Sequence, residues 1–324
     1  MCVSHIPAEV TLEAAPCPNG CASGDDLLFT AQDRLFGLPG RFPVVRCCTC
    51  GLIRTEPRPT PETIRFYYPD NTYCAYVLSP GHPGPASLLR RCLRSLYCRA
   101  FRVNNYVLPD IPPGRMLEVG CATGSFLAEM KAKSWAVEGI EPSKSAAVRA
   151  QAAGLNVFCG TLESAPDPRR PFDLAVGWMV VEHLHQPLMA LRKLAGWVRP
   201  EGWLVISVPD AGRLHLRLFK DRWFALQVPT HLYHFTEESI TALLRKAGWH
   251  VERVFHHRSL FNCAYSISYV LEDGGAPKCV CEFPRQVVGR PLGRLALYPA
   301  AYVLAALKQT GLITLWARRG AAVS

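Results

Sequence analysis

The chain has 324 residues, of which 49% are apolar, so it can fill a substantial core and is not disordered over most of its length. Its 14 cysteines are scattered along a chain whose first residues lack the pattern of a secretion signal, which predicts reduced thiols and a cytoplasmic location. The formal net charge of +10 fits an anionic partner and an ordinary solvated surface equally well.

The first third of the chain differs in pattern from the rest. Residues 1–60 are rich in Cys, Pro and Gly and show no long periodic segment. Residues 88–102 carry Leu and Phe at helical spacing among five arginines and predict a basic amphipathic helix. We therefore expect a small module over 1–60, a helical basic linker over 61–108 and a larger domain over 109–319.

From Arg115 onward, strand-like runs alternate with helical patterns. Strands are predicted at 115–120, 135–140, 155–158, 172–178 and 203–208, and helices at 124–133, 143–153, 187–198 and 236–247. This alternation is typical of a parallel sheet with helices on both faces. Two further strands are predicted at 249–255 and 311–319, with a helical insertion over 257–310. The apolar run at 295–307 is shorter than the ~20 residues of a membrane-spanning helix, so it is expected to lie on a membrane at most.

A glycine-containing turn follows the first strand of this larger region. In MLEVGCATGSF, Gly120 and Gly124 let the backbone approach a ligand beside a helix N-terminus. The second strand ends in GIEP, and Glu141 follows Gly120 by about twenty residues, where a carboxylate can accept hydrogen bonds from both ribose hydroxyls of an adenosine ligand. Positions 120, 122 and 125 are Gly, Ala and Ser, which argues against a nicotinamide cofactor. Glu118 suits a cationic ligand.

The motifs LEVGCATG, GIEP, FDLAVGWMVVEHL and a strand ending in VPD occur in this order. The chain thereby resembles the class I S-adenosylmethionine-dependent methyltransferases over residues 110–256 and 311–319. The resemblance implies S-adenosylmethionine as the cofactor. It also implies a doubly wound, Rossmann-like α/β fold whose seven-stranded sheet is mostly parallel with an antiparallel last strand.

The same resemblance assigns cofactor-binding roles to the matching positions. The methionine end is assigned to the first strand and its turn, the ribose to the end of the second strand, the adenine to the loop after the third, and the floor beneath the sulfonium to the end of the fourth. In chain order these residues are Glu118, Gly120, Cys121, Ala122, Thr123 and Gly124, then Glu141 and Pro142, then Leu162 and Glu163, then Trp178 and Met179.

Two cysteine pairs, Cys17-x-x-x-Cys21 and Cys47-x-x-Cys50, are separated by a stretch that could form a short hairpin. Four thiolates satisfy tetrahedral zinc and leave no open position, so the predicted site is structural and staples a module with little core. Cys48 is an alternative ligand to Cys47, and unliganded thiols are the alternative to zinc. VVRCCTCGLIRTEPRP is similar to the N-terminal zinc-binding region of some bacterial methyltransferases, including deoxysugar C-methyltransferases.

The loops after the strands that end near Trp178 and Val208 are expected to surround the transferable methyl group. The second loop exceeds twenty residues, which predicts a lid or a binding element. Its VPTHLYHFTEESI resembles the segment with the catalytic histidine of zinc-containing sugar C-methyltransferases, which places His231 at the position of the base. His234 and His183 are the next candidates, and a structural role is the alternative for each. Other members of the family that the chain resembles bind a divalent metal through E-x-x-E-H after the fourth strand, where the matching residues here are Met179, Glu182 and His183. One ligand is therefore missing, and no catalytic metal is predicted.

These observations predict methyl transfer to a small-molecule or glycan acceptor. The basic segment 88–102 and the apolar segment 295–307 fit an acceptor carried on a phosphorylated lipid or nucleotide, and a peripheral contact with the inner face of a membrane. The alternatives are an RNA methyltransferase and a zinc-knuckle nucleic-acid-binding module with a non-catalytic Rossmann domain. The sequence shows no aromatic and basic strand motif for stacking bases, which disfavours a nucleic-acid partner.

Overall fold

A seven-stranded sheet organises the C-terminal part of the chain in the computed structural model, which describes residues 6–22, 24–69 and 107–320. The sheet has the order β12-β13-β10-β9-β6-β7-β8. Its strands are β6 (Arg115–Val119), β7 (Ala136–Glu141), β8 (Asn156–Cys159), β9 (Phe172–Trp178), β10 (Val198–Pro209), β12 (Trp249–His256) and β13 (Leu312–Arg319). The helix predicted over 88–102 lies outside the described residues.

The strand directions confirm the predicted fold class. Strands β8, β7, β6, β9 and β10 are parallel to one another, whereas β13 is antiparallel to both β10 and β12. The chain winds from β6 toward β8 on one side and continues from β9 on the other. The strand order therefore reverses between β6 and β9, which is where α/β sheets of this kind bind ligands.

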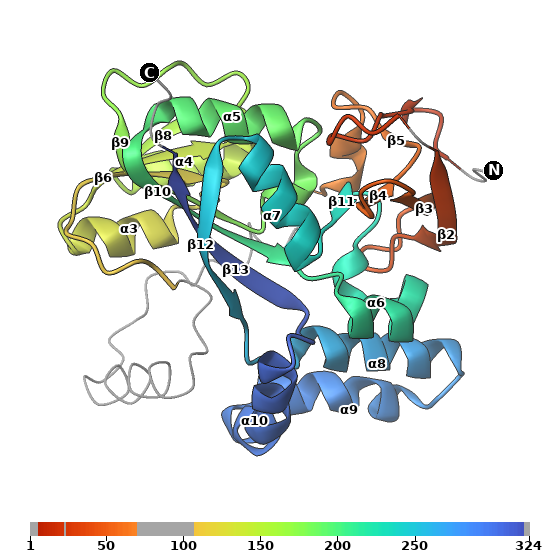
Figure 1. Ribbon diagram of the computed structural model, residues 1–324. Coiled ribbons are helices and arrows are strands. Elements are labelled where there is room, and N and C mark those ends of the chain that lie inside the picture. The colour runs from red at the N-terminus through yellow and green to blue at the C-terminus, as the bar shows by residue number, and fades with distance from the viewer. Residues whose placement is uncertain (1–5, 23, 70–106, 321–324) are drawn as a thin grey trace.

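Helices cover both faces of the sheet, as the alternation predicted (Figure 1). On one face, α3 (Ser125–Ala132) packs through Phe126 and Met130 against Leu174 and Val176 of β9. On the other face, α5 (Pro187–Trp197) and α7 (Glu237–Lys246) bury their apolar sides against alternate strand residues such as Ala175. Successive strand residues point to opposite faces, so both faces of β9 contribute to a core. The remaining sheet helix is α4 (Lys144–Ala152).

Three helices occupy the connection between β12 and β13 and form a lobe beyond the ends of these strands (Figure 1). They are α8 (Phe261–Asp273), α9 (Lys278–Gly289) and α10 (Pro291–Ala306). Several large apolar side chains of α9 and α10 face outward, and Leu292 is 80% exposed. Within the described ranges, no helix combines the length and the apolar character needed to cross a bilayer.

The N-terminal residues form a second sheet, of order β11-β4-β3-β2. Its strands β2 (Asp25–Gln32), β3 (Arg41–Cys47) and β4 (Ile53–Thr55) come from the first 60 residues. The fourth strand, β11 (Tyr233–His234), comes from the loop after β10 and pairs antiparallel with β4. Beside this sheet, β1 (Leu12–Glu13) pairs with β5 (Arg58–Pro59), and η1 (Ile64–Tyr67) follows.

The long loop after β10 is folded onto this second sheet and is not an open lid. It contains α6 (Arg213–Phe219), η3 (Lys220–Arg222) and η4 (Phe224–Leu226) before β11. Trp223, Leu226 and Val228 are buried in one cluster with Phe42 and Val44 of β3. The apolar side chains of the loop therefore hold it against the N-terminal residues.

Candidate functional site

The turn after β6 has the backbone geometry expected of a ligand-binding loop. Gly120 and Gly124 have φ angles of +70° and +79°, which favour glycine. A Cβ atom at Gly120 would lie 2.6 Å from Cγ2 of Val180, and one at Gly124 would lie 2.3 Å from Cδ1 of Leu155. Helix α3 starts directly after Gly124, which as the N-cap residue has no side chain to cap the helix. A helix N-terminus in this place favours an anionic or polar ligand group.

Two buried acids flank this turn. Glu118 lies one residue before the end of β6, Glu141 is the last residue of β7, and each is 3% exposed. The backbone amides of Ala122 and Ser143 donate to the two carboxylate oxygens of Glu141, both at 2.8 Å, and fix it beside the turn. Oε2 of Glu118 has no hydrogen-bond partner among the described residues. Burial and the charge of Glu141 raise the pKa of Glu118 well above its usual value.

The remaining predicted cofactor residues lie along the same edge of the sheet. Trp178 ends β9 and packs edge-to-face on Phe126 of α3, with ring centroids 5.3 Å apart. Met179 follows with a φ angle of +57°, and its amide donates to the carbonyl of Ser207 at 2.9 Å. Leu162 is buried in the main core. Around them, Cys121 is buried, Thr123 is half-buried, and Pro142 and Glu163 are exposed.

The four predicted zinc ligands come together in the N-terminal part. The sulfur atoms of Cys17, Cys21, Cys47 and Cys50 all lie within 4.8 Å of one another. The exposed Cys48 is not in this group, so the structure brings Cys47 and not Cys48 to the cluster. Burial opposes ionisation of Cys50, but hydrogen bonds led by that from Asn19 lower its pKa to about 7. Four converging thiols, one of them readily ionised, fit the donor set of a structural zinc site.

A second cluster lies just past the end of β9. The short helix η2 (Val181–His183) brings Glu182 and His183 together with His231 from the folded loop. One ligand atom of each of these three residues lies within 4.8 Å of the others. The two imidazole rings meet edge-to-face with centroids 4.6 Å apart. Glu182 is 0% exposed, and neither of its carboxylate oxygens has a hydrogen-bond partner among the described residues.

Hydrogen bonds fix both rings of this cluster. Nδ1 of His183 lies 2.8 Å from the carbonyl oxygen of Thr230, and Nδ1 of His231 lies 2.8 Å from that of Ala225. A carbonyl oxygen only accepts, so each Nδ1 carries the hydrogen and each Nε2 keeps its lone pair. The hydroxyl oxygen of Tyr68 also lies 2.8 Å from Nδ1 of His183.

Burial sets the protonation of the cluster. It lowers the pKa of His183 to about 4 and that of His231 well below its usual value, so both imidazoles are neutral near pH 7. Burial also raises the pKa of the Glu182 carboxyl to about 8. His234, the third predicted catalytic histidine, lies on β11 with Nε2 3.3 Å from Oγ1 of Thr55, and burial lowers its pKa to about 3. The contact with Thr55 shows that the His234 side chain faces the N-terminal sheet.

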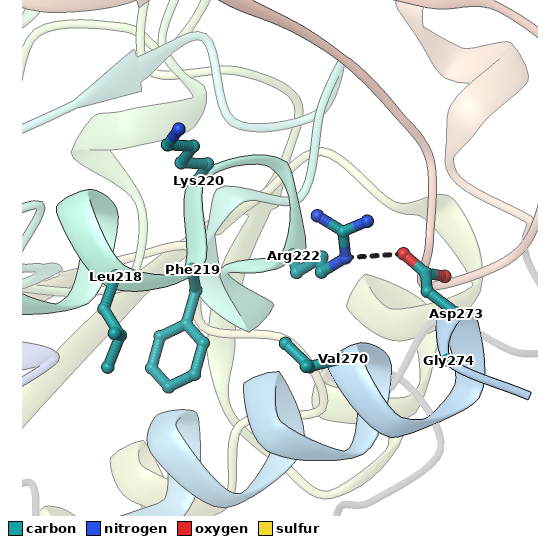
Figure 2. A pocket seen from close by; sticks show the side chains of 7 residues that line it. All are labelled: Leu218, Phe219, Lys220, Arg222, Val270, Asp273 and Gly274. Carbon is teal, nitrogen blue, oxygen red and sulfur yellow. Dashed lines mark hydrogen bonds and ion pairs between the residues drawn. The ribbon is translucent and has the colours of Figure 1, made fainter. Parts of the chain in front are cut away.

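A surface hollow of about 480 Å³ lies elsewhere, between α6 and the C-terminal half of α8. Figure 2 shows it, with Arg222 and Asp273 joined across it by an ion pair of 2.6 Å. Phe219 and Val270 contribute apolar walls. None of the residues predicted to bind the cofactor or the acceptor lines this hollow.

A sheet of this topology, with a glycine turn after its first strand and acids ending its first two strands, defines the class I S-adenosylmethionine-dependent methyltransferases. The chain belongs to this family, because residues 91–254, just over half of its length, match the model of a methyltransferase domain.

Several known proteins are similar to parts of the chain. A ubiquinone biosynthesis O-methyltransferase of Bradyrhizobium diazoefficiens is 31% identical over 121 residues, which cover 36% of this chain and 47% of that protein. One from Rhodopseudomonas palustris is 29% identical over 120 residues, with the same coverage. The chain thus spans about half the length of the curated relatives it matches.

Two bacterial methyltransferases of solved structure are also similar to this chain. An S-adenosylmethionine-dependent methyltransferase from Mesorhizobium loti has 18% identity and a TM-score of 0.44, and covers 68% of this chain and 95% of that one. Another from Thermotoga maritima has 19% identity and a TM-score of 0.46, and covers 71% of this chain and 96% of that one.

Proposed function

We propose that the protein transfers the methyl group of S-adenosylmethionine to a small-molecule acceptor. The observation that carries this proposal is the buried, unpartnered carboxylate oxygen of Glu118 beside the Gly120 turn. A buried carboxylate without a partner is unfavourable, and a cationic ligand would balance its charge. S-adenosylmethionine carries both an ammonium and a sulfonium group, and its positively charged sulfur supplies the methyl group.

The cofactor would lie across the carboxyl ends of β6, β7 and β9. Glu118 and the turn from Gly120 to Gly124, with Cys121, Ala122 and Thr123 between them, would hold the methionine end. Glu141, next to Pro142, would accept hydrogen bonds from the ribose hydroxyls, because its carboxylate is already held in place by two backbone amides. Leu162 and Glu163 would border the adenine, and Trp178 and Met179 would form the floor beneath the sulfonium.

The acceptor would meet the methyl group near Glu182, His183 and His231. Methyl transfer is an in-line displacement, so the acceptor's lone pair must point at the methyl carbon. A hydroxyl acceptor must also lose its proton. The neutral imidazoles of this cluster could take or direct that proton. We assign this role first to His231, then to His183 and His234.

The similarity to the named O-methyltransferases supports an oxygen atom of a small molecule as the methyl acceptor. A sugar or glycan linked to a phosphorylated lipid or nucleotide is our narrower proposal, supported by the net charge of +10. The exposed apolar side chains of α10 support a peripheral membrane contact, since Leu292 is 80% exposed and Arg290 and Arg294, close to it in the sequence, are also exposed.

We also propose that the four-cysteine cluster binds a structural zinc ion. The convergence of Cys17, Cys21, Cys47 and Cys50 and the small size of the surrounding module support this role.

The test of the proposed function is transfer of a label. Purified protein is mixed with methyl-labelled S-adenosylmethionine and a panel of phenols, nucleotide sugars, lipid-linked glycans and RNAs, and products are identified by mass spectrometry. We expect label in one small-molecule class and loss of that label in Glu118→Gln. Label found only in RNA would contradict the acceptor class, and absence of cofactor binding in calorimetry would contradict the proposal as a whole.

A further inference from the structure

We propose that the hollow between α6 and α8 binds an apolar chain, acyl or isoprenoid, that is attached to the methyl acceptor through an anionic group. The identity of this ligand as the acceptor rests on the proposed function, which the inference narrows to an amphipathic substrate. The volume of about 480 Å³ lies within the range of about 300–1,000 Å³ that is typical of small-ligand sites. The hollow is therefore the right size for part of a small molecule.

The walls of the hollow are apolar on both helices. Leu218 of α6 and Val270 of α8 line it and are 63% and 44% exposed, although the two helices pack against each other. Phe219 is buried, and Figure 2 shows its ring pointing toward α8. An apolar chain in the hollow would remove the Leu218 and Val270 side chains from water, which is favourable in proportion to the area covered.

The exposed apolar surface continues from the hollow along each helix. Leu214 precedes Leu218 by four positions and is 38% exposed, and Ile267 precedes Val270 by three positions and is 39% exposed. Residues three or four positions apart lie on the same face of a helix. Each helix thus adds a second exposed aliphatic side chain to the face that borders the hollow, and this extended surface suits a chain better than a compact ligand.

The position of α6 connects the hollow to the acceptor side. The helix starts four residues after Pro209, which ends β10 at the same edge of the sheet as the parallel strand β9. Its seven residues make it about 10 Å long, and the hollow lies at its C-terminal end. Leu214 is in its first turn and Leu218 in its last. A chain that extends from an acceptor at the sheet edge would therefore reach the hollow along α6.

The charges around the hollow favour an anionic link between the chain and the reactive part of the acceptor. Arg222 and Asp273 line one end and neutralise each other in an ion pair of 2.6 Å. Lys220 also lines the hollow, and Figure 2 shows its side chain on the opposite side of the turn from Phe219. Lys220 and the neighbouring Arg217 are both exposed. The balance of charge is positive, which complements a phosphate or carboxylate.

Binding of n-dodecyl phosphate to the full-length protein, measured by calorimetry below its micelle concentration, tests the inference. We expect one molecule per chain. Leu218→Glu places a charge in the hollow and Val270→Trp fills it, so each should weaken binding by at least tenfold. Met189→Glu is the matched control, because Met189 is 56% exposed on α5, and its affinity should equal that of the wild type. Inorganic phosphate alone should not compete.

The anionic link is tested separately with an uncharged detergent. Lys220→Gln should weaken binding of n-dodecyl phosphate and leave binding of n-dodecyl maltoside unchanged. Equal losses for both ligands would contradict the anionic link, and competition by inorganic phosphate as strong as that by the dodecyl compound would overturn the apolar site.

Spectra of protein with isotope-labelled Leu and Val methyl groups locate the chain without relying on variants. The signals of Leu218 and Val270 should shift when n-dodecyl phosphate is added, whereas that of Leu27, which is 52% exposed on β2, should not. Absence of binding by the wild type, shifts confined to other methyl groups, or unchanged affinity in both hollow variants would overturn the inference. So would a stable dimer that Leu218→Glu dissociates, because a second copy would then occupy the hollow.

A pair of acceptors separates this inference from the proposed function. The acceptor found in the labelling panel is compared with and without an apolar chain. Leu218→Glu should raise the KM of the chain-bearing acceptor at least tenfold and leave unchanged both the KM of the chain-free acceptor and the affinity for S-adenosylmethionine. An unchanged KM for the chain-bearing acceptor would overturn the role in acceptor binding. Protein that binds n-dodecyl phosphate in the hollow but transfers no methyl group would contradict the proposed function and not the apolar site.

Discussion

Replacement of Glu141 by alanine should weaken S-adenosylmethionine binding by about 10- to 150-fold. A hydrogen bond to a charged group contributes about 1.5–3 kcal/mol, and each 1.4 kcal/mol is a factor of about ten in affinity. The carboxylate of Glu141 is 3% exposed and accepts from the backbone amides of Ala122 and Ser143, both at 2.8 Å. It is therefore held in one position before any ligand binds, and little of the contact energy is spent on ordering it.

The same substitution should also lower stability, because it leaves those two backbone amides without their acceptor. The cost is about 1–3 kcal/mol for each amide that stays buried and unsatisfied. Glu141→Gln is the more selective change, since its amide oxygen can still accept from one of the two N–H groups. Its NH₂ group must face the other donor, so Gln should retain part of the stability and lose most of the ribose contact.

Calorimetric titration with S-adenosylmethionine or its demethylated product measures the affinity, and urea denaturation of the same samples measures the stability. Glu129→Ala is the matched control, because it removes one negative charge from an exposed side chain of α3 and leaves the turn unchanged. Unchanged cofactor affinity in a folded Glu141→Ala variant would remove Glu141 from the ribose site and refute the reasoning.

Four further outcomes follow from the structure. Cys17→Ser should lower the zinc content by one ion per chain while cofactor binding persists, and equal zinc content in variant and wild type would rule out the cysteine site. His231→Ala should keep cofactor affinity and lose roughly 10²–10⁴-fold in turnover, whereas near-normal turnover at saturating acceptor would end its catalytic assignment. Burial raises the pKa of Asp210 to about 7, so the folded state holds the proton of this carboxyl more tightly than the unfolded state does, and the wild type should lose stability as the pH rises from about 4 to above 7. Asp210→Asn should flatten that loss in urea denaturation at pH 5 and pH 8. Parallel pH curves for variant and wild type would contradict the assignment of this pKa to Asp210. Leu292→Glu should weaken flotation with vesicles containing anionic phospholipid, and equal flotation would argue against α10 as the contact surface.

The fold could be predicted because the strands of the main sheet carry a strong local pattern. Buried parallel strands are continuous apolar runs, and FDLAVGW of β9 is one of them. The placement of Glu118 and Glu141 also followed from the sequence, since parallel strands end at a common edge. Spacing alone could not decide whether Cys47 or Cys48 joins the cysteine cluster. The two residues are neighbours of the same type, and only the structure shows the direction of each side chain.

The cluster of Glu182, His183 and His231 could not be predicted because it depends on long-range contacts. Glu182 and His231 are far apart in the sequence, and nothing in the local pattern of either segment indicates that they meet. Tyr68 reaches His183 from a segment after the N-terminal module, and no motif in that segment predicts the contact. The strand β11 has only two residues, too few for any alternation to show, so the sequence predicts a lid or a binding element there and not a paired strand.

The pairing of β11 with β4 means that the N-terminal sheet cannot be exchanged or removed independently of the loop after β10. Thr55 binds this loop twice, because its hydroxyl donates to the carbonyl of His231 at 3.0 Å and its amide donates to that of Leu232 at 3.0 Å. Arg58 reaches the hydroxyl of Tyr233 at 2.8 Å. A shortened protein that starts after the N-terminal module would keep the glycine turn and its acids but lose three of the four strands that hold the loop. In a chimera between relatives, the two segments would have to be inherited together for the acceptor side to assemble.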